Sequence, residues 1–208
     1  MKSSKILSNK NKKTGLFFGS FNPVHTGHLI LANYFTEHAG LDEIWFVVTP
    51  QNPLKKQSNL LPDYHRLYMA RLATEPYSKF KVSTVEFDLP KPNFTIVTLE
   101  KLKEDYPNRR FILLMGQDAL ISLPKWKNFE QILSDYRIFV YPRRYGGSSD
   151  LLVHPSVIFF EQAPVVEISA SQIRNDLKAG KNVRPLLPHE VYQYIIEMGF
   201  YKDTPIVR

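Results

Sequence analysis

The sequence contains no cysteine. This absence excludes disulfide bonds, a thiolate nucleophile and any zinc site with cysteine ligands. Long hydrophobic runs are also lacking, because the longest, such as Ile44 to Val48 and Phe111 to Met115, are far shorter than the roughly 20 residues of a membrane-spanning helix. No membrane partner is therefore expected. The basic N-terminus is not followed by the apolar segment of a secretory signal, so we expect a cytoplasmic protein.

The net charge of +7 is concentrated at the N-terminus. Five lysines and no acidic residue lie within residues 1–13, and the remainder has 22 basic against 20 acidic residues. We expect residues 1–13 to form a disordered basic tail, because a polar segment cannot bury enough surface to offset its lost conformational entropy. The nearly neutral remainder, residues 14–208, is expected to form a single domain that binds no nucleic acid. A non-catalytic module that binds nucleotides or nucleic acid remains an alternative, supported only by the tail.

Short apolar runs alternate with segments of helical periodicity from Thr14 onward. This alternation predicts an α/β fold, a Rossmann-like, doubly wound, mainly parallel sheet with helices on both faces. Strands buried on both faces are expected at Gly15 to Phe18, Glu43 to Thr49, Phe111 to Met115, Arg137 to Tyr141 and Val157 to Phe160. Phe80 to Phe87 alternates between apolar and polar residues, so we expect it nearer an edge. Helices are expected at His28 to His38, Tyr64 to Thr74, Thr95 to Asp105, Ser169 to Ala179 and Pro188 to Met198.

The segment GSFNPVHTGH, residues 19–28, joins the first predicted strand directly to a helix. Ligands of open α/β sheets bind at the carboxyl ends of strands, where a helix N-terminus offers free N–H groups to an anion. Gly19 allows a ligand to approach the backbone, and Gly27 is expected to leave the first helical turn uncovered. His25 and His28, three residues apart, would project from one face toward phosphate oxygens. A metal pair or a structural pair of histidines are the alternatives, although no third ligand has a recognisable spacing.

This segment resembles the Gly-Thr/Ser-Phe-x-Pro-x-His-x-Gly-His signature of the nucleotidylyltransferase superfamily. Two further segments are similar to that superfamily and follow in the expected order, FILLMGQD at 111–118 and ISASQIR at 168–174. PNFT at 92–95 and LPKW at 123–126 resemble the nicotinate mononucleotide adenylyltransferases within it. The resemblance covers nearly all of residues 15–201 and implies transfer of the adenylyl group of ATP to nicotinate mononucleotide, a step of NAD biosynthesis. Superfamily members that use nicotinamide mononucleotide or phosphopantetheine remain alternatives.

The resemblance also implies two groups of site residues. The residues expected to bind ATP are Gly19, Ser20, Phe21, His25, His28, Gly116, Asp118, Ser169, Ser171 and Arg174. Among these, His25, His28 and Arg174 are expected to be catalytic, because imidazoles and a guanidinium suit the phosphates and the pyrophosphate leaving group. The residues expected to bind the mononucleotide are Asn52, Lys55, Thr95 and Trp126. A Mg²⁺ ion is expected to bind mainly through the ATP phosphates, with no metal site on the protein.

Some of these residues have a structural alternative. Asp118 could cap the helix that follows it, Arg174 could be a solvated helix charge, and Trp126 could be a buried core residue. The sequence leaves the oligomeric state open, with a homo-oligomer among the alternatives.

The loop from Thr49 to Lys56 departs from the family pattern. Leu54 stands where a histidine is commoner in the family, so the phosphate contacts of Asn52 and Lys55 stay open. Asn22 in place of the more frequent aspartate is a milder departure that leaves the chemistry of the turn intact.

Overall fold

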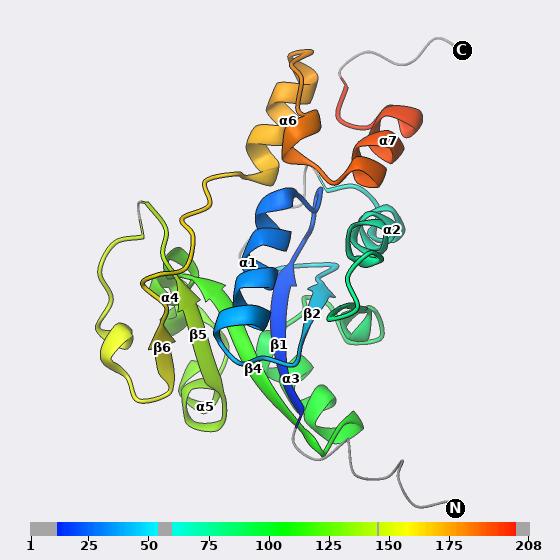
Figure 1. The fold of residues 1–208 in the computed structure, drawn as a ribbon. Coiled ribbons are helices and arrows are strands. Elements are labelled where there is room, and N and C mark those ends of the chain that lie inside the picture. Colours follow the sequence, from blue (N-terminus) through cyan, green and yellow to red (C-terminus); the bar gives the residue numbers. More distant parts are fainter. Residues whose placement is uncertain (1–11, 54–59, 145, 203–208) are drawn as a thin grey trace, which may run out of the picture.

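A six-stranded parallel sheet forms the centre of the structure, a computed structural model that describes residues 12–53, 60–144 and 146–202 (Figure 1). All five pairs of neighbouring strands are parallel. In order across the sheet the strands are β3 (Phe80–Ser83), β2 (Glu43–Val48), β1 (Lys12–Gly19), β4 (Arg109–Gly116), β5 (Arg137–Tyr141) and β6 (Val157–Phe159). This confirms the predicted doubly wound α/β fold.

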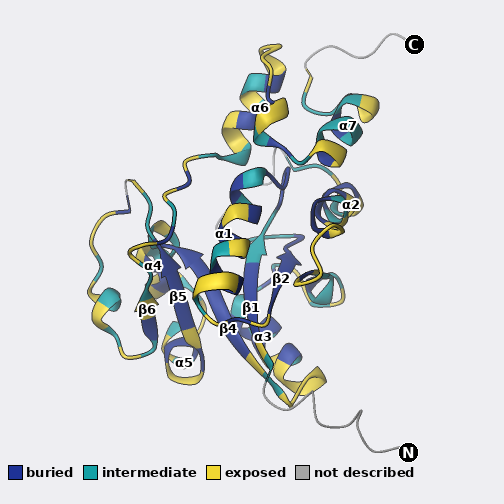
Figure 2. Ribbon diagram, viewed as in Figure 1, coloured by how far each residue is buried: buried dark blue, intermediate teal, exposed yellow. Residues whose placement is uncertain are grey.

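Two hydrophobic cores, one on each face of the sheet, account for the continuous apolar strands. Successive residues of a strand point to opposite faces, so Phe17 and Phe46 enter one core and Leu16 and Val47 the other. The first core includes α1 (Thr26–His38), α2 (Asp63–Thr74), α6 (Ala170–Lys178) and α7 (His189–Met198). The second includes α3 (Thr95–Asp105), α4 (Gln117–Ser122) and α5 (Phe129–Asp135). Figure 2 shows the strands as buried between these helices.

The strand order reverses between β1 and β4. The chain winds outward from β1 to β3 on one side, then returns to the other side of β1 and continues to β6. In a doubly wound sheet, this reversal opens a crevice at the carboxyl ends of the two central strands. These ends are Gly19 and Gly116, so the segment that begins at Gly19 lies at the crevice.

Three of the strands differ from what the sequence predicts. Lys12 and Lys13 belong to β1, so the expectation that they form part of a disordered tail is wrong. Strand β6 is an edge strand, and Ile158 is 40% exposed, so its expected burial on both faces is wrong. The expected edge position of β3 is confirmed, but the strand ends at Ser83 and a 3-10 turn, η1 (Val85–Phe87), follows it. Residues 1–11 lie outside the described part of the chain.

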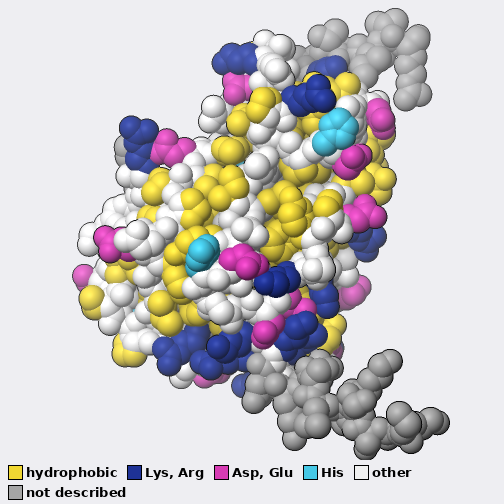
Figure 3. Space-filling view, viewed as in Figure 1, with side chains coloured by type: hydrophobic (Ala, Val, Ile, Leu, Met, Phe, Trp, Pro, Cys, Tyr) yellow, Lys and Arg dark blue, Asp and Glu magenta, His cyan; other side chains and the backbone are white. Residues whose placement is uncertain are grey.

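A buried ion-pair network ties the strands together at their amino ends. The Glu43 carboxylate, on β2, accepts hydrogen bonds from Lys12 at 2.7 Å, Trp45 at 2.7 Å and Arg109. Lys81 lies 3.2 Å from it. Burial alone would raise the pKa of Glu43, but these hydrogen bonds and positive charges lower it to about 2. Figure 3 shows Lys and Arg side chains along the lower edge of the molecule, where the strands in Figure 1 begin.

None of the helices in the described ranges is long and apolar enough to span a membrane.

Candidate functional site

A pocket of about 410 Å³ lies at the carboxyl ends of β1 and β4, where the strand order reverses. Phe18 and Met115, near the last residues of these strands, form part of its wall. Seven of the predicted site residues line the pocket: Gly19, Ser20, Asn52, Thr95, Gly116, Asp118 and Trp126. These residues come from five segments of the sequence, and the topology of the sheet brings them together.

A larger hollow of about 560 Å³ lies at the opposite end of the sheet. Two of the arginines that line this hollow already have partners within the protein. Arg109 donates a hydrogen bond to Glu43, and Arg137 donates to the Pro155 carbonyl at 2.8 Å. Helices α3 and α5 end near this hollow, and positive side chains complement the partial negative charge of helix C-termini. We therefore place the functional site at the carboxyl ends.

Six other predicted site residues do not line the pocket. Lys55 lies outside the described residues, and the remaining six are Phe21, His25, His28, Ser169, Ser171 and Arg174. The Arg174 guanidinium donates from Nη1 to the Asn22 carbonyl at 2.8 Å and from Nη2 to Ser171 Oγ at 3.2 Å. The structure therefore brings Arg174, across 152 residues of sequence, to the loop that carries the two histidines.

His28 has one ring nitrogen fixed by the backbone. Its Nδ1 accepts a hydrogen bond from the His25 backbone N–H at 3.1 Å, so the neutral ring carries its hydrogen on Nε2. The ring makes edge contacts with Phe17 and Phe21, at centroid distances of 5.6 and 5.1 Å. His28 is half-buried at the start of α1. These contacts hold an N–H donor in one orientation at a helix N-terminus, which suits an anion.

His25 is more buried than the sequence predicts. It is only 5% exposed, and its ring stacks on His28 with 3.7 Å between centroids. Its Nδ1 atom is buried without a hydrogen-bond partner among the described residues. Burial, followed by the positive charge of Arg143, lowers the pKa of His25 from 6.5 to about 4. The expectation of two open imidazoles is therefore wrong for His25, which is a buried, neutral ring behind His28.

The lowered pKa of His25 predicts a loss of stability in acid. The unfolded chain takes up a proton on this residue below about pH 6.5, whereas the folded protein resists protonation until about pH 4. The free energy of unfolding should therefore fall as the pH drops from 6.5 toward 4, by up to about 1.4 kcal/mol per pH unit from this residue. Urea denaturation at several pH values between 7.5 and 4.5 measures this fall in the free energy of unfolding.

His25→Gln should flatten this acid-side slope, because glutamine does not titrate. The control is His38→Gln, since His38 is exposed at the other end of α1 and should keep the wild-type slope. An equally steep acid-side loss in His25→Gln would show that another group causes it.

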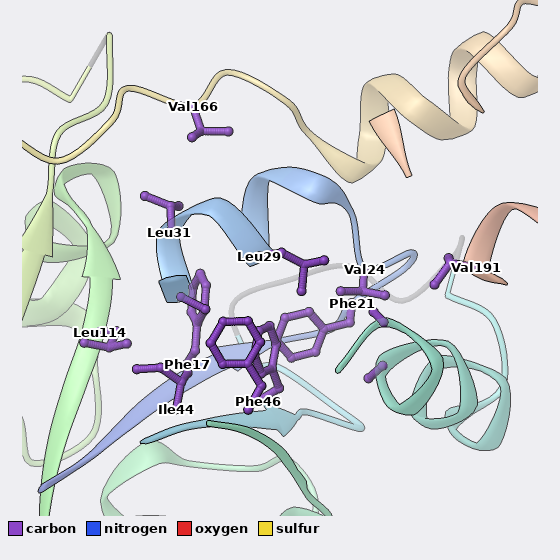
Figure 4. Close-up of a cluster of buried hydrophobic side chains, with 14 of the residues drawn as sticks. Phe17, Phe21, Val24, Leu29, Leu31, Ile44, Phe46, Leu114, Val166 and Val191 are labelled. Carbon is purple, nitrogen blue, oxygen red and sulfur yellow. The ribbon is translucent and has the colours of Figure 1, made fainter. Parts of the chain in front are cut away.

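Two glycines of the turn are required by packing. A Cβ at Gly19 would lie 2.9 Å from the Phe21 ring, and a Cβ at Gly27 would lie 2.6 Å from Val166 Cγ1. Figure 4 shows Val166 on the segment that passes over α1. The first turn of α1 is therefore covered by Val166, and the expectation that Gly27 leaves it open is wrong.

Phe21 has its side chain in the core. It is 2% exposed, and its ring lies 5.5 Å from that of Phe46 (Figure 4). Its φ of 44° is in the left-handed region, which is uncommon for a residue with a large side chain. Only its main chain can face a nucleotide, as the resemblance implies.

The helix that begins at Ala170 is capped by one of the predicted site residues. Ser169 Oγ accepts a hydrogen bond from the Gln172 N–H at 3.1 Å, which satisfies one of the free N–H groups of α6.

Asp118 does not cap α4. The N-cap position is Gly116, and no side chain caps it. The Asp118 carboxylate instead lies 3.4 Å from Nε of Arg143, and both side chains line the pocket. The capping alternative for Asp118 is therefore wrong, and its exposed carboxylate can accept hydrogen bonds from a ligand.

Arg143 is a site residue that the sequence reasoning missed. It follows the carboxyl end of β5 by two residues, lines the pocket and donates to the Val166 carbonyl at 2.7 Å. Its charge acts on His25, as the lowered pKa of that residue indicates. The signal was available, because a charged residue shortly after a buried strand lies at the same edge of the sheet as Gly19, the last residue of β1.

Trp126 lies where the second core meets the pocket. It is half-buried against the second core, and it also lines the pocket. Its Nε1 atom is buried without a hydrogen-bond partner in the described part of the chain. Thr95, the first residue of α3, and Phe94 line the same end of the pocket, and Lys127 Nζ lies 4.8 Å from the Phe94 ring centroid. This end combines aromatic faces with positive charge.

Glu86 and Asn93 are buried polar residues of the pocket that the sequence reasoning also missed. Asn93 Oδ1 accepts from the Gln51 N–H at 3.0 Å, and Asn93 Nδ2 donates to the Glu86 carbonyl at 2.9 Å. Thr98, on α3, donates to Glu86 Oε1 at 2.7 Å. Burial raises the pKa of Glu86. These bonds fix the chain after β2 to the start of α3.

The residues that the structure describes contain no group of three or more His, Asp or Glu side chains that could hold a metal ion.

The family model described as cytidylyltransferase-like matches residues 16–176. A protein of Flavobacterium johnsoniae, named as a probable nicotinate-nucleotide adenylyltransferase, is 54% identical over 192 residues, which are 91% of this chain and 99% of that protein. A protein of Bacteroides fragilis with the same name is 48% identical, over 89% of this chain and 92% of that protein. The matches span nearly the full length of these relatives.

Solved structures with the same fold are more distant in sequence. The Plasmodium falciparum nicotinic acid mononucleotide adenylyltransferase complexed with NaAD has a TM-score of 0.78 at 19% identity, covering 92% of this chain and 98% of that one. A Vibrio parahaemolyticus structure, described as a putative nicotinate-nucleotide adenylyltransferase, has a TM-score of 0.69 at 20% identity, covering 93% of this chain and 97% of that one. At these identities the likeness supports the fold.

Proposed function

The chain belongs to the nicotinate-nucleotide adenylyltransferases of the cytidylyltransferase-like family, and we propose that it uses the pocket at the carboxyl ends of β1 and β4 for that reaction. The enzyme transfers the adenylyl group of ATP to nicotinate mononucleotide, which gives nicotinate adenine dinucleotide and pyrophosphate. The main observation in support of this site is the position of the pocket, at the carboxyl ends of the two central strands where the strand order reverses.

In this proposal, ATP binds at the β4 side of the pocket and along the turn after β1. Asp118 accepts hydrogen bonds from ribose hydroxyls, and the backbone at Gly19 and Gly116 allows close approach. The phosphates extend beyond the pocket toward the start of α1, where His28 Nε2 acts as a donor. Arg143, at the pocket wall, adds a positive charge near the nucleotide.

Nicotinate mononucleotide would then bind at the opposite end of the pocket. Trp126 offers an aromatic face for the pyridine ring, and Thr95 closes the pocket beside it. Asn52 lines the same cavity, and Lys55, in the segment outside the described residues, remains the predicted contact for the phosphate. The two substrates then meet above Ser20, between the two ends.

The reaction we propose is a direct in-line displacement. A phosphate oxygen of nicotinate mononucleotide attacks the α-phosphorus of ATP, and the bond to the pyrophosphate oxygen breaks. The nucleophile is already an anion, so the enzyme has to align two phosphates that repel each other and neutralise the charge that develops on the leaving group. His28 and Arg174 contribute donors for this purpose. His25 supports His28 from behind, as a neutral ring.

Mg²⁺ remains a prediction from the sequence and would arrive with ATP. The donors around the proposed phosphate position are imidazole and guanidinium groups, which suit phosphate oxygens, while Asp118 is the exposed carboxylate of the pocket. A hydrated Mg²⁺ held by ATP fits this set, because it needs few protein ligands and supplies charge neutralisation at the phosphates. Cytoplasmic location and the oligomeric state also stay predictions from the sequence.

A pyrophosphate-release assay with three acceptors tests the proposed function. We expect rapid release with ATP and nicotinate mononucleotide, and release slower by about tenfold or more with nicotinamide mononucleotide or phosphopantetheine. The dinucleotide product is identified by mass spectrometry. Equal rates with the acid and amide mononucleotides would assign a broader acceptor range, and release with phosphopantetheine alone would contradict the proposal.

A further inference from the structure

Arg66 is the largest fully buried side chain among the residues that the structure describes. It lies on α2, is 0% exposed, and has one acidic partner, Asp63, whose side chain is 33% exposed. A buried guanidinium is costly unless its donors are satisfied. The cost of burying the Arg66 guanidinium indicates that it has a specific role between the sheet and α2.

All five N–H donors of Arg66 are used. Nε donates to the Leu61 carbonyl at 3.0 Å, and Nη1 donates to the carbonyls of Ser20 at 2.6 Å and Thr49 at 2.9 Å. Nη2 donates to the Pro50 carbonyl at 3.3 Å and to the Asp63 carboxylate. A guanidinium has five donors in a rigid planar arrangement, and each of them has an acceptor here.

Three of the five acceptors of Arg66 belong to the two loops assigned above to the two substrates. Ser20 follows β1, in the turn assigned to ATP, whereas Thr49 and Pro50 follow β2 and lead into the loop assigned to the mononucleotide. Ser20 and Thr49 both line the pocket. Leu61 also donates from its backbone N–H to Asn22 Oδ1 at 3.2 Å, so it is bonded to the same turn. One planar group therefore sets the separation of the two walls.

We propose that Arg66 is a positioning residue that fixes the distance between the bound acceptor phosphate and the α-phosphorus of ATP. The inference rests on the proposed function and deepens it. In-line transfer depends on the near-attack geometry of two separately bound phosphates, and a misplacement of about 1 Å can cost about a hundredfold in rate. Arg66 acts through backbone carbonyls and touches neither substrate.

Arg66→Lys is the test variant, because lysine keeps the charge but has three donors on a flexible stem. We expect kcat per folded molecule to fall by about thirtyfold or more, while the Kd of each substrate measured alone changes by less than about threefold. Each loop would keep its own contacts, and only their relative position would change. Kinetics come from pyrophosphate release, and Kd values from calorimetry with nicotinate mononucleotide and with a non-hydrolysable ATP analogue.

Glu43→Gln is the matched control. Glu43 is also a buried charge with several hydrogen bonds, but it lies at the amino ends of the strands, away from the pocket. We expect this variant to lower Tm and to leave kcat per folded molecule within about twofold of the wild type. A purely structural Arg66 would behave in the same way.

Asp63→Asn provides a second variant in case Arg66→Lys does not fold. The amide oxygen can still accept from Nη2, but the guanidinium loses its counter-charge and is held less firmly. We expect kcat to fall severalfold at unchanged Kd values.

The inference is overturned if the folded Arg66→Lys enzyme keeps its kcat, or if weakened binding of one substrate accounts for the whole loss. When Arg66→Lys is unfolded, an unchanged kcat in Asp63→Asn overturns it. Wild-type protein that releases no pyrophosphate with any acceptor would instead refute the proposed function, so the two failures are distinguishable.

Discussion

His28→Ala is expected to lower the turnover of the enzyme by about a hundredfold or more, the scale of losing one donor to a developing oxyanion. The hydrogen bond from the His25 N–H to Nδ1 at 3.1 Å leaves Nε2 as the donor of the neutral ring. Phe17 and Phe21 fix the orientation of the ring, so little reorganisation is needed when the transition state forms. Steady-state pyrophosphate release at saturating substrates measures the loss.

His38→Ala is the control for this prediction, because it removes an exposed imidazole from the last turn of the same helix. Its turnover should match that of the wild type. His28→Ala also removes the acceptor of the His25 N–H, so the folded fraction of each variant has to be measured by circular dichroism. Near-normal turnover in a fully folded His28→Ala enzyme would rule out the donor role.

Arg174→Ala is expected to lower kcat by about ten- to a hundredfold. Arg174 donates to the Asn22 carbonyl at 2.8 Å and to Ser171 Oγ at 3.2 Å, which places a planar cation beside the turn that carries His28. A guanidinium can bond two oxygens of a phosphate at once, whereas the ammonium of lysine acts as a point charge. Arg174→Lys should therefore recover only part of the lost turnover.

Inhibition by pyrophosphate separates a direct role of Arg174 from an indirect one. If Arg174 holds the leaving group, the inhibition constant for pyrophosphate should rise by about tenfold or more in Arg174→Ala. An unchanged constant together with a lower kcat would show that Arg174 acts only by holding the turn through Asn22. Arg184→Ala, a change of the same type at an exposed position, should alter neither quantity.

The sequence was informative where a local pattern has one physical solution. Continuous apolar runs such as Ile44 to Val48 fit only strands covered on both faces, and the structure divides their side chains between two cores. The glycine- and histidine-containing segment after β1 predicted the position of the crevice, because the carboxyl ends of parallel strands meet at one edge.

Burial of polar groups was the main feature that the sequence could not provide. Nothing in the residues around His25 distinguishes a solvated imidazole from one that is 5% exposed with a pKa near 4. In the sequence DYHRLYM, Arg66 looks like an ordinary charged residue of a helix. Its proposed role follows from three backbone acceptors that are distant in the sequence, at Ser20, Thr49 and Pro50. Burial and partners are set by what packs on a residue from elsewhere in the chain.

The sequence by itself determined the α/β class, most of the strand and helix segments, the turn proposed to receive phosphate, and the family to which these motifs are similar. Each of these depends on periodicity or on residues close together in the chain. Only the tertiary structure decided that Arg143 and Asp118 share a pocket wall, that Val166 covers the first turn of α1, and that Arg66 joins the two substrate loops. These contacts connect segments whose separation in space is fixed by the winding of the whole sheet.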